Sequence, residues 1–381
     1  MRNPTALSAL LLVLVAFSGA ACKKKVESIE ELDTDDKKPA VDPALAEAVA
    51  AASASAAPSA NPRAEGGPPP NGVFPPGAAD KELVRGAAPK ITMGGEGTEP
   101  RVRLTGLPPL GKQQMRVRFV QISGRGGAPL DLELGMEVTE PKAAAGDAGT
   151  APGGRQVVGT VQSAKLDAAR LAQQVPASVE AEVAKLKGSK VSFVVEPSGC
   201  GRDFVVEVSK AAGGNQNDML SSLGGLLATV TLPVPPQPVG KGAMWMATTR
   251  ETVLGIDTLS YRLIKVESFE SGKAVLKIDT KRYAADARQV VPALAEGGAV
   301  EFQAFQAEGN GFVTVPTAGG LPLEGKITRD LRALLIVSSR GSQPMMMQER
   351  VEGVIEGVTA EGQGGTNDSP PAQPAPAAPQ P

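Results

Sequence analysis

Strict alternation of apolar and polar residues predicts that much of the chain folds into β-strands. In the clearest segment, residues 130–138, leucine, methionine or valine occupies every second position, and aspartate, glutamate or glycine occupies the others. This two-residue period is typical of a half-buried strand with one apolar face and one solvated, acidic face. Similar patterns occur at residues 115–119, 191–195, 204–208, 261–266, 274–278, 312–315, 334–337 and 351–355, with an isolated apolar residue at Phe302.

Short turn sequences join several of these segments. Residues 197–201, Pro-Ser-Gly-Cys-Gly, separate two alternating runs, and Ser271-Gly272 separates another two. Such connections favour hairpins of antiparallel strands. The sequence therefore predicts a mainly β protein of the α+β class, built from bent antiparallel sheets.

Helical spacing predicts one helical connection near residues 165–187. Apolar residues recur there at intervals of four and three, at Val175, Val179, Val183 and Leu186. Pro176 is expected to separate a first short helix from a second, and Gly188 to end the second. A short turn or helix is expected at residues 218–227, before a proline-rich crossing at residues 233–238.

The N-terminus has the layout of a secretory signal peptide. Arg2 precedes an apolar run over residues 7–17, small residues follow, and Cys22 precedes three lysines. The run is too short for a transmembrane helix. Residues 1–21 are therefore expected to be a signal peptide, and Cys22 the palmitate-bearing lipid acceptor of a lipoprotein in the bacterial cell envelope, on an undetermined membrane face. Gly19 stands where an aliphatic residue is common, so ordinary cleavage near Ala20 or Ala21 is the alternative.

Composition divides the rest of the chain. Residues 22–82 are expected to be the lipidated cysteine and a disordered Ala/Pro-rich tether, and residues 363–381 a disordered Pro-rich tail. Such segments cannot bury enough apolar surface to offset the entropy of ordering. Residues 83–214 and 215–362 are expected to form two β-rich halves. Similar phrases at residues 107–112 and 236–241 would fit a duplication, and chance with shared turn chemistry would also explain them.

Composition also excludes several function classes. The formal net charge is −2 and aromatic residues make up 3% of the chain, so neither electrostatics nor stacking favours nucleic acid as a partner. The chain has no histidine, which excludes His-dependent triads and zinc sites. Its two cysteines cannot form a disulfide framework if Cys22 carries lipid.

Motifs that could support chemistry are incomplete. Residues 106–112 and 320–326 have the glycine and lysine spacing of a phosphate-binding loop, but Gln113 and Ile327 stand where serine or threonine is needed. Strand-entry turns explain both segments better. The acidic pairs Asp131 with Glu133 and Glu267 with Glu270 are typical of solvated strand faces.

Cys200 lies between two glycines, with Arg202 close by. Arg202 could lower its pKa and make it reactive, but an incidental turn cysteine is the preferred interpretation. No catalytic, cofactor-binding or metal-binding residue is expected, and Cys22 is the single site residue.

The region around Trp245 resembles a family of bacterial β-rich lipoproteins of unknown function. Residues 238–240, Pro-Val-Gly, lead to Trp245, and Tyr-Arg-Leu at residues 261–263 and Gly272 follow. The similarity extends from about Ile91 to Val337, although only the part around Trp245 is distinctive. Residues 241–243, Lys-Gly-Ala, replace an acidic residue that the family often has before the tryptophan. The resemblance implies no activity. Trp245 itself is expected to be buried in the core.

These observations predict a non-catalytic protein, anchored to a membrane through its N-terminal lipid, with a tethered β-rich domain for binding or scaffolding an unknown envelope protein. The alternative is a periplasmic carrier or binder of lipid or another apolar ligand. An apolar cavity in the folded domain would favour the carrier.

Overall fold

The structure, a computed structural model, describes residues 68–123, 129–141, 153–167, 170–171, 175–211, 214–253, 255–291, 299–337 and 344–358. Cys22, the expected signal peptide and the expected tail at residues 363–381 lie outside these ranges. Among the described residues, no helix combines the length and the apolar character needed to cross a membrane.

Strands dominate the described chain. The helices are α2 (Ala78–Glu82), α3 (Ala177–Ala184) and α4 (Gly214–Val230). The strands are β1 (Lys90–Gly95), β2 (Thr98–Val102), β3 (Gly111–Ser123), β4 (Pro129–Thr139), β5 (Arg155–Leu166), β6 (Lys190–Val195), β7 (Gly201–Glu207), β8 (Val239–Lys241), β9 (Met244–Val253), β10 (Ile256–Glu270), β11 (Lys273–Ala284), β12 (Arg288–Val290), β13 (Ala299–Pro316), β14 (Glu324–Val337) and β15 (Pro344–Val358).

Within the described residues, 13 strands form one antiparallel sheet, so the expected mainly β class is confirmed. The strand order is β1-β9-β10-β11-β13-β14-β15-β3-β4-β5-β6-β7, with β12 beside β13, and β2 pairs with β8 in a small second sheet. Both expected β-rich halves contribute strands to this one sheet, because β15 pairs with β3 along ten residues, from Glu349 opposite Ser123 to Val358 opposite Gln114.

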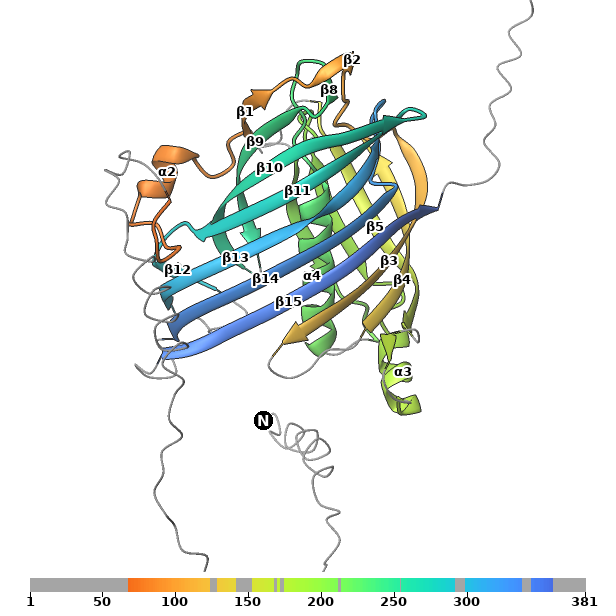
Figure 1. Cartoon of the computed structure of the whole chain (residues 1–381). Coiled ribbons are helices and arrows are strands. Elements are labelled where there is room, and N and C mark those ends of the chain that lie inside the picture. Colours follow the sequence, from red (N-terminus) through yellow and green to blue (C-terminus); the bar gives the residue numbers. More distant parts are fainter. Residues whose placement is uncertain are drawn as a thin grey trace, which may run out of the picture. The chain divides into compact units, whose positions relative to one another are not determined.

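Helix α4 connects strands that lie at or near the two opposite edges of this sheet. It follows β7 at one edge of the strand order and leads through β8 to β9, near the other edge. It packs against β7 and also reaches β3, β14 and β15. In Figure 1 the sheet curves around α4, with β13, β14 and β15 in front of it and β3, β4 and β5 beside it. The connection therefore crosses the inner face of the sheet.

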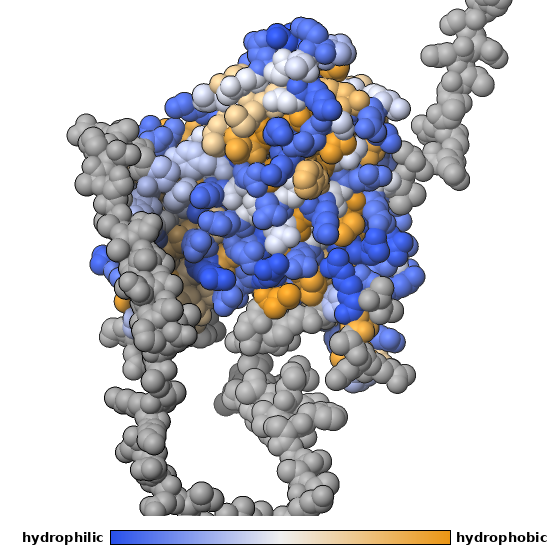
Figure 2. All heavy atoms as spheres, in the orientation of Figure 1, coloured by the Kyte–Doolittle hydropathy of each residue, from blue (hydrophilic) through white to orange (hydrophobic). Residues whose placement is uncertain are grey.

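The core lies between this inner face and α4. The helix contributes Leu220, Leu223, Leu226, Leu227 and Val230, all almost fully buried. The sheet contributes the apolar side of each alternating strand, for example Phe119, Leu132 and Leu134. Figure 2 shows that the visible outer surface is instead mostly hydrophilic with scattered apolar patches. The alternation in the sequence thus separates an inner apolar face from an outer wet face.

The helical prediction for residues 165–187 is confirmed for the second helix, which begins after Pro176, and is wrong at its start. Lys165 and Leu166 continue β5 and pair with Asp131 and Leu130 of β4. Among the described residues of this stretch, Ala177–Ala184 form the α-helix, with Pro176 at its N-cap. Val183 and Leu186 are buried, but Val179 is 38% exposed, so the periodic face is only partly used. The longest helix of the described residues is α4, which extends beyond the short turn or helix expected at residues 218–227 at both ends.

The expected boundary of the tether at residue 82 is also wrong, because residues 68–82 dock onto the sheet. The Gly72 carbonyl accepts a hydrogen bond from the Ala284 amide, and the Phe74 amide donates to the Ala284 carbonyl. The Phe305 amide donates to the Asn71 carbonyl. This segment therefore lies between the end of β11 and β13, where composition alone suggested no order.

The apolar residues of the docked segment, residues 68–82, pack on both faces of the sheet. Val73 joins a buried cluster with Phe302, Phe305 and Leu335, whereas Phe74 packs with Ala79, Leu259 and Ala285.

The expected turns are confirmed. Ser271 and Gly272 both have positive φ and join β10 to β11 as a two-residue hairpin, with Glu270 opposite Lys273. The loop between β6 and β7 is the hairpin expected at residues 197–201. Both glycine- and lysine-containing segments enter strands, at Gly111 of β3 and Glu324 of β14.

Trp245 is fully buried, as expected, and its indole N–H donates a 2.9 Å hydrogen bond to the Pro233 carbonyl. We predict that Trp245→Ala lowers the free energy of unfolding by about 3–5 kcal/mol, because it leaves a large cavity and an unpaired carbonyl. Urea titration followed by circular dichroism measures this loss. Wild-type emission should be blue-shifted and poorly quenched by iodide. Red-shifted, easily quenched emission from the folded protein would contradict the assignment.

Candidate functional site

A band of charged and polar side chains crosses the otherwise apolar inner face of the sheet. Arg262 of β10, Arg282 of β11 and Arg329 of β14 are each no more than 2% exposed, and Glu349 of β15 is 5% exposed. Glu251 of β9 lies with them, with a side chain only 12% exposed. Buried charges require partners. We call these five residues the inner charged band.

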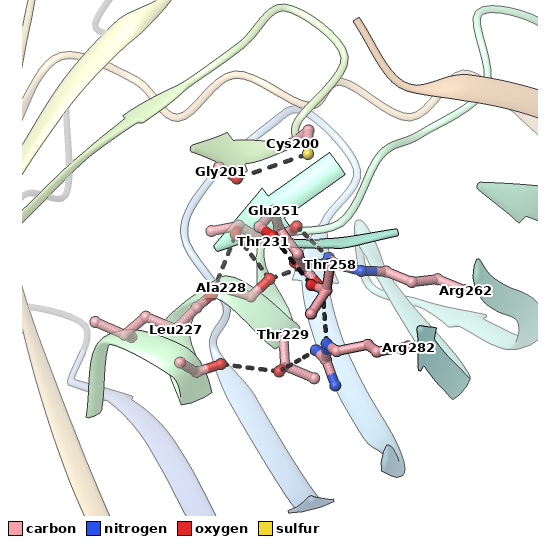
Figure 3. Close-up of polar contacts among 11 residues, drawn as sticks. Cys200, Gly201, Leu227, Ala228, Thr229, Thr231, Glu251, Thr258, Arg262 and Arg282 are labelled. Carbon is pink, nitrogen blue, oxygen red and sulfur yellow. Dashed lines mark hydrogen bonds and ion pairs between the residues drawn. The ribbon is translucent and has the colours of Figure 1, made fainter. Parts of the chain in front are cut away.

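Glu251 holds one half of the band together (Figure 3). Arg282 Nε donates to Glu251 Oε1 at 2.6 Å, and Arg262 pairs with the other carboxylate oxygen. Burial by itself would raise the pKa of Glu251, but the charges of the two arginines and the hydrogen bond from Arg282 lower it to about 2. Glu251 therefore stays ionised over the physiological range.

Glu349 holds the other half. Its Oε2 accepts a 2.9 Å hydrogen bond from Arg329 Nη2. Its Oε1 accepts from Ser222 Oγ of α4 at 2.9 Å and from Gln121 Nε2 of β3 at 3.0 Å. This carboxylate thus links β14, β15, β3 and the helix.

A stripe of small and polar residues on α4 faces the band. Ser222, Gly225 and Thr229 are three and four residues apart, so they lie on one side of the helix. Ser222 donates to Glu349, and Thr229 Oγ1 accepts from Arg282 Nη2 at 3.2 Å. A Cβ at Gly225 would lie 1.9 Å from Arg329 Nη1, so only glycine lets this arginine reach the helix backbone.

Arg262 secures the end of the helix. Its Nη1 donates to the carbonyls of Ala228 at 3.0 Å and Thr231 at 3.3 Å (Figure 3). Carbonyl groups in the last turn of a helix have no intrahelical partner and carry partial negative charge, so a cation there is favourable. The inner charged band therefore positions α4 along its length.

This arrangement suits positioning better than acid–base chemistry. Both carboxylates are paired with guanidinium groups, and arginine does not release its proton near neutral pH. In the described part of the chain, no three acidic or cysteine side chains gather closely enough to hold a metal ion.

Cys200, weighed above as a reactive thiol, is buried in the turn before β7. Burial raises its pKa to about 12, which outweighs the opposing charges of Arg262 and Arg202. The structure therefore contradicts the reactive interpretation, because the thiolate is the nucleophilic form.

The acidic pairs considered above do not converge on a site. Arg116 forms a two-pronged ion pair with Asp131, with distances of 2.8 and 2.6 Å, while Glu133 is exposed. Glu267 pairs with Lys265 at 3.0 Å. These are surface ion pairs on the outer face of the sheet.

A hollow of about 630 Å³ opens on the outer face, beside the docked N-terminal segment. Residues 68–72, which include Pro68, Pro69 and Pro70, form one wall. The outward-facing side chains of β11, β13, β14 and β15 supply the floor and the other walls, among them Lys281, Tyr283, Gln306, Glu308, Arg332, Leu334 and Met346. Its volume is within the range of ligand sites, and its lining mixes apolar surface with both signs of charge. We call it the outer hollow.

A second, much smaller pocket lies on the inner side. This pocket, at the edge of the core between Gly106, Leu232, Leu276 and Leu321, has a volume of about 30 Å³. This is space for one or two water molecules, not for an acyl chain.

Sequence reasoning missed the inner charged band, although a signal was present. Arg262 has the same strand parity as Ile264 and Val266, and Arg329 has the parity of Ile327 and Leu331. A charge at an apolar position of an alternating strand indicates a buried ion pair or a functional group. The partners, which lie on other strands, cannot be read from this pattern.

Comparisons with known proteins add little. No family model matches the chain, and no curated protein matches it. A solved structure concerned with lipid–protein interactions in lipovitellin is similar to 71% of this chain, with a TM-score of 0.40 and 11% sequence identity. The similar region spans 26% of the lipovitellin chain. A similarity at this level carries no conclusion about function.

We predict that Glu251→Gln lowers the free energy of unfolding at pH 7 by about 3–5 kcal/mol, because two buried arginines lose their anion. In the wild type, the pKa of Glu251 is lower in the folded state than in the unfolded state. Its contribution is therefore complete above pH 4.5 and is lost as the pH falls towards 2. The difference between the two proteins should shrink over that interval, as measured by urea unfolding.

Glu133→Gln, on the exposed face of β4, is the matched control and should change the free energy of unfolding by less than about 0.5 kcal/mol. A Glu251→Gln protein as stable as the wild type at pH 7 would show that the ion pairs are dispensable.

Proposed function

We propose that the protein is a non-catalytic binding protein, anchored to a membrane of the bacterial cell envelope through lipid on Cys22, and that it holds a segment of a partner polypeptide in the outer hollow. The outer hollow is the observation that carries this proposal. It is open, so an extended segment of another chain can enter without unfolding the domain. The apolar Met346, which is 65% exposed, and the charged Lys281, Arg332 and Glu308 offer both contact area and orientation.

The filled inner face supports binding on the outside. Leu220, Leu223, Leu226 and Leu227 of α4 are each at most 1% exposed against the sheet. Their packing occupies the space that an internal ligand would need.

A carrier of lipid or another apolar ligand is the second candidate. One observation favours it: among the described elements, α4 covers the apolar inner face of a strongly curved sheet, and that face would accept acyl chains if α4 moved away. Lipid that co-purifies with the protein in a 1:1 ratio, detected by mass spectrometry of an organic extract, would favour this candidate.

The anchor is tested at Cys22. We predict that Cys22→Ser abolishes incorporation of labelled palmitate and moves the protein from the membrane to the soluble fraction, because no other lipid acceptor is expected near the signal peptide. Cys200→Ser, which changes the buried turn cysteine, is the control and should remain labelled and membrane-bound. Membrane retention of Cys22→Ser, together with an unlabelled wild type, would refute lipid anchoring.

The outer hollow is tested by site-specific photocrosslinking in cells. We predict that a photoreactive phenylalanine at Met346 crosslinks to one discrete polypeptide, because this side chain lines the hollow. The same group at Phe312, also exposed on the outer side of the sheet but outside the hollow, should give no such product. Arg332→Glu should abolish the crosslink from Met346. Equal products from both positions, or none from Met346, would contradict a partner in the outer hollow.

A further inference from the structure

The inner charged band has an unequal number of charges. Its arginines are Arg262, Arg282 and Arg329, and its acids are Glu251 and Glu349, which leaves one positive charge in excess among these described residues. Arginine cannot lose this charge by deprotonation. Burial of an uncompensated charge is strongly unfavourable, because little solvent remains to stabilise it.

Arginine donors of the band, and the hydroxyl of the neighbouring Thr280, also lack acceptors. Arg282 Nη1, Arg329 Nε, Arg329 Nη1 and Thr280 Oγ1 are buried and find no hydrogen-bond partner among the described residues. The side chains of Arg282 and Arg329 are only 1% and 2% exposed. Buried polar groups are normally paired, so each of these donors requires an acceptor.

These donors lie around Gly309 of β13. Thr280 of β11 is its register partner on one side, and Arg329 of β14 is its partner on the other. A Cβ at Gly309 would lie 3.7 Å from Arg282 Nη1. Because Gly309 has no side chain, the inner face between the two arginines is free of side-chain atoms at this position of β13.

Helix α4 covers the same region. Thr229 contacts Arg282, and Gly225 lies against Arg329 Nη1. Bulk water is therefore excluded, and an acceptor that enters this region must be small.

We propose that Arg282, Arg329 and Thr280 form a buried site over Gly309 for one small monovalent inorganic anion of the chloride type. One negative charge balances the excess of the inner charged band. The anion accepts the hydrogen bonds that the guanidinium and hydroxyl groups offer. The anion also connects the half of the band around Glu251 with the half around Glu349, beneath α4. Its binding therefore stabilises the position of the helix on the sheet.

Thermal unfolding of the full chain tests the site, with sodium chloride, sodium bromide and sodium isethionate compared at equal ionic strength. Isethionate is too large for the site. A halide at ten times its Kd should raise the Tm by about 3 °C, and the increase should saturate. Equal Tm values in all three salts would overturn the proposal.

Two glycine substitutions localise the effect. Gly309→Ala places a methyl group where the anion binds, with its tightest contact 3.2 Å from the Thr328 carbonyl oxygen, so it should abolish the halide effect while keeping the fold. Gly325→Ala on β14 meets only ordinary contacts of 3.5 Å or more and should keep the halide effect. A halide effect that persists in Gly309→Ala would place the anion elsewhere and refute the site.

Crystals of the full chain grown in sodium bromide provide a direct test. An anomalous peak should lie within hydrogen-bonding distance of Arg282 Nη1 and Arg329. Density with no anomalous signal at that position would identify a water molecule and overturn the proposal.

Discussion

The architecture depends on how α4 is held while it crosses the inner face of the sheet. Strands β7 and β9 lie near opposite ends of the strand order of the large sheet, so the connection between them must pass from one side of the sheet to the other. Apolar packing is not directional, so apolar contacts alone would let α4 shift along the sheet or rotate about its own axis. The stripe of Ser222, Gly225 and Thr229 removes that freedom, because each residue meets a specific charged partner on the sheet. Directional hydrogen bonds in a low-dielectric interior select one position of the helix.

The ion pairs of the inner charged band need not add net stability. Replacement of buried ion pairs by apolar residues is often neutral or stabilising, whereas removal of one partner is costly. Their contribution here is positional, since Glu349 links β14, β15, β3 and α4 at a single carboxylate. Close packing depends on glycines as well, and a Cβ at Gly353 would lie 2.5 Å from Leu226.

The curvature of the sheet separates two surfaces of different composition. The inner surface is apolar and covered by α4, and the outer surface is mostly hydrophilic where Figure 2 shows it. Residues 68–82 help to shape that outer surface, because they lie between β11 and β13 and form a wall of the outer hollow. A segment expected to be a tether therefore contributes directly to the proposed binding site.

The sequence by itself determined the strands, several hairpins and the burial of Trp245, because alternation and turn chemistry are local properties. It also contained charges at apolar positions, such as Arg262 and Arg329. Only the tertiary structure decided their partners, because the pairing of the strands brings Arg262 to Glu251 and Arg329 to Glu349. It also paired β3 with β15 across more than 200 residues of chain, as Gly353 opposite Phe119 shows. The same long-range packing ordered Val73 and Phe74 within a polar, proline-rich segment and extended α4 beyond its local signal. Contacts between distant residues supplied the free energy in these places, and no short window of sequence records such contacts.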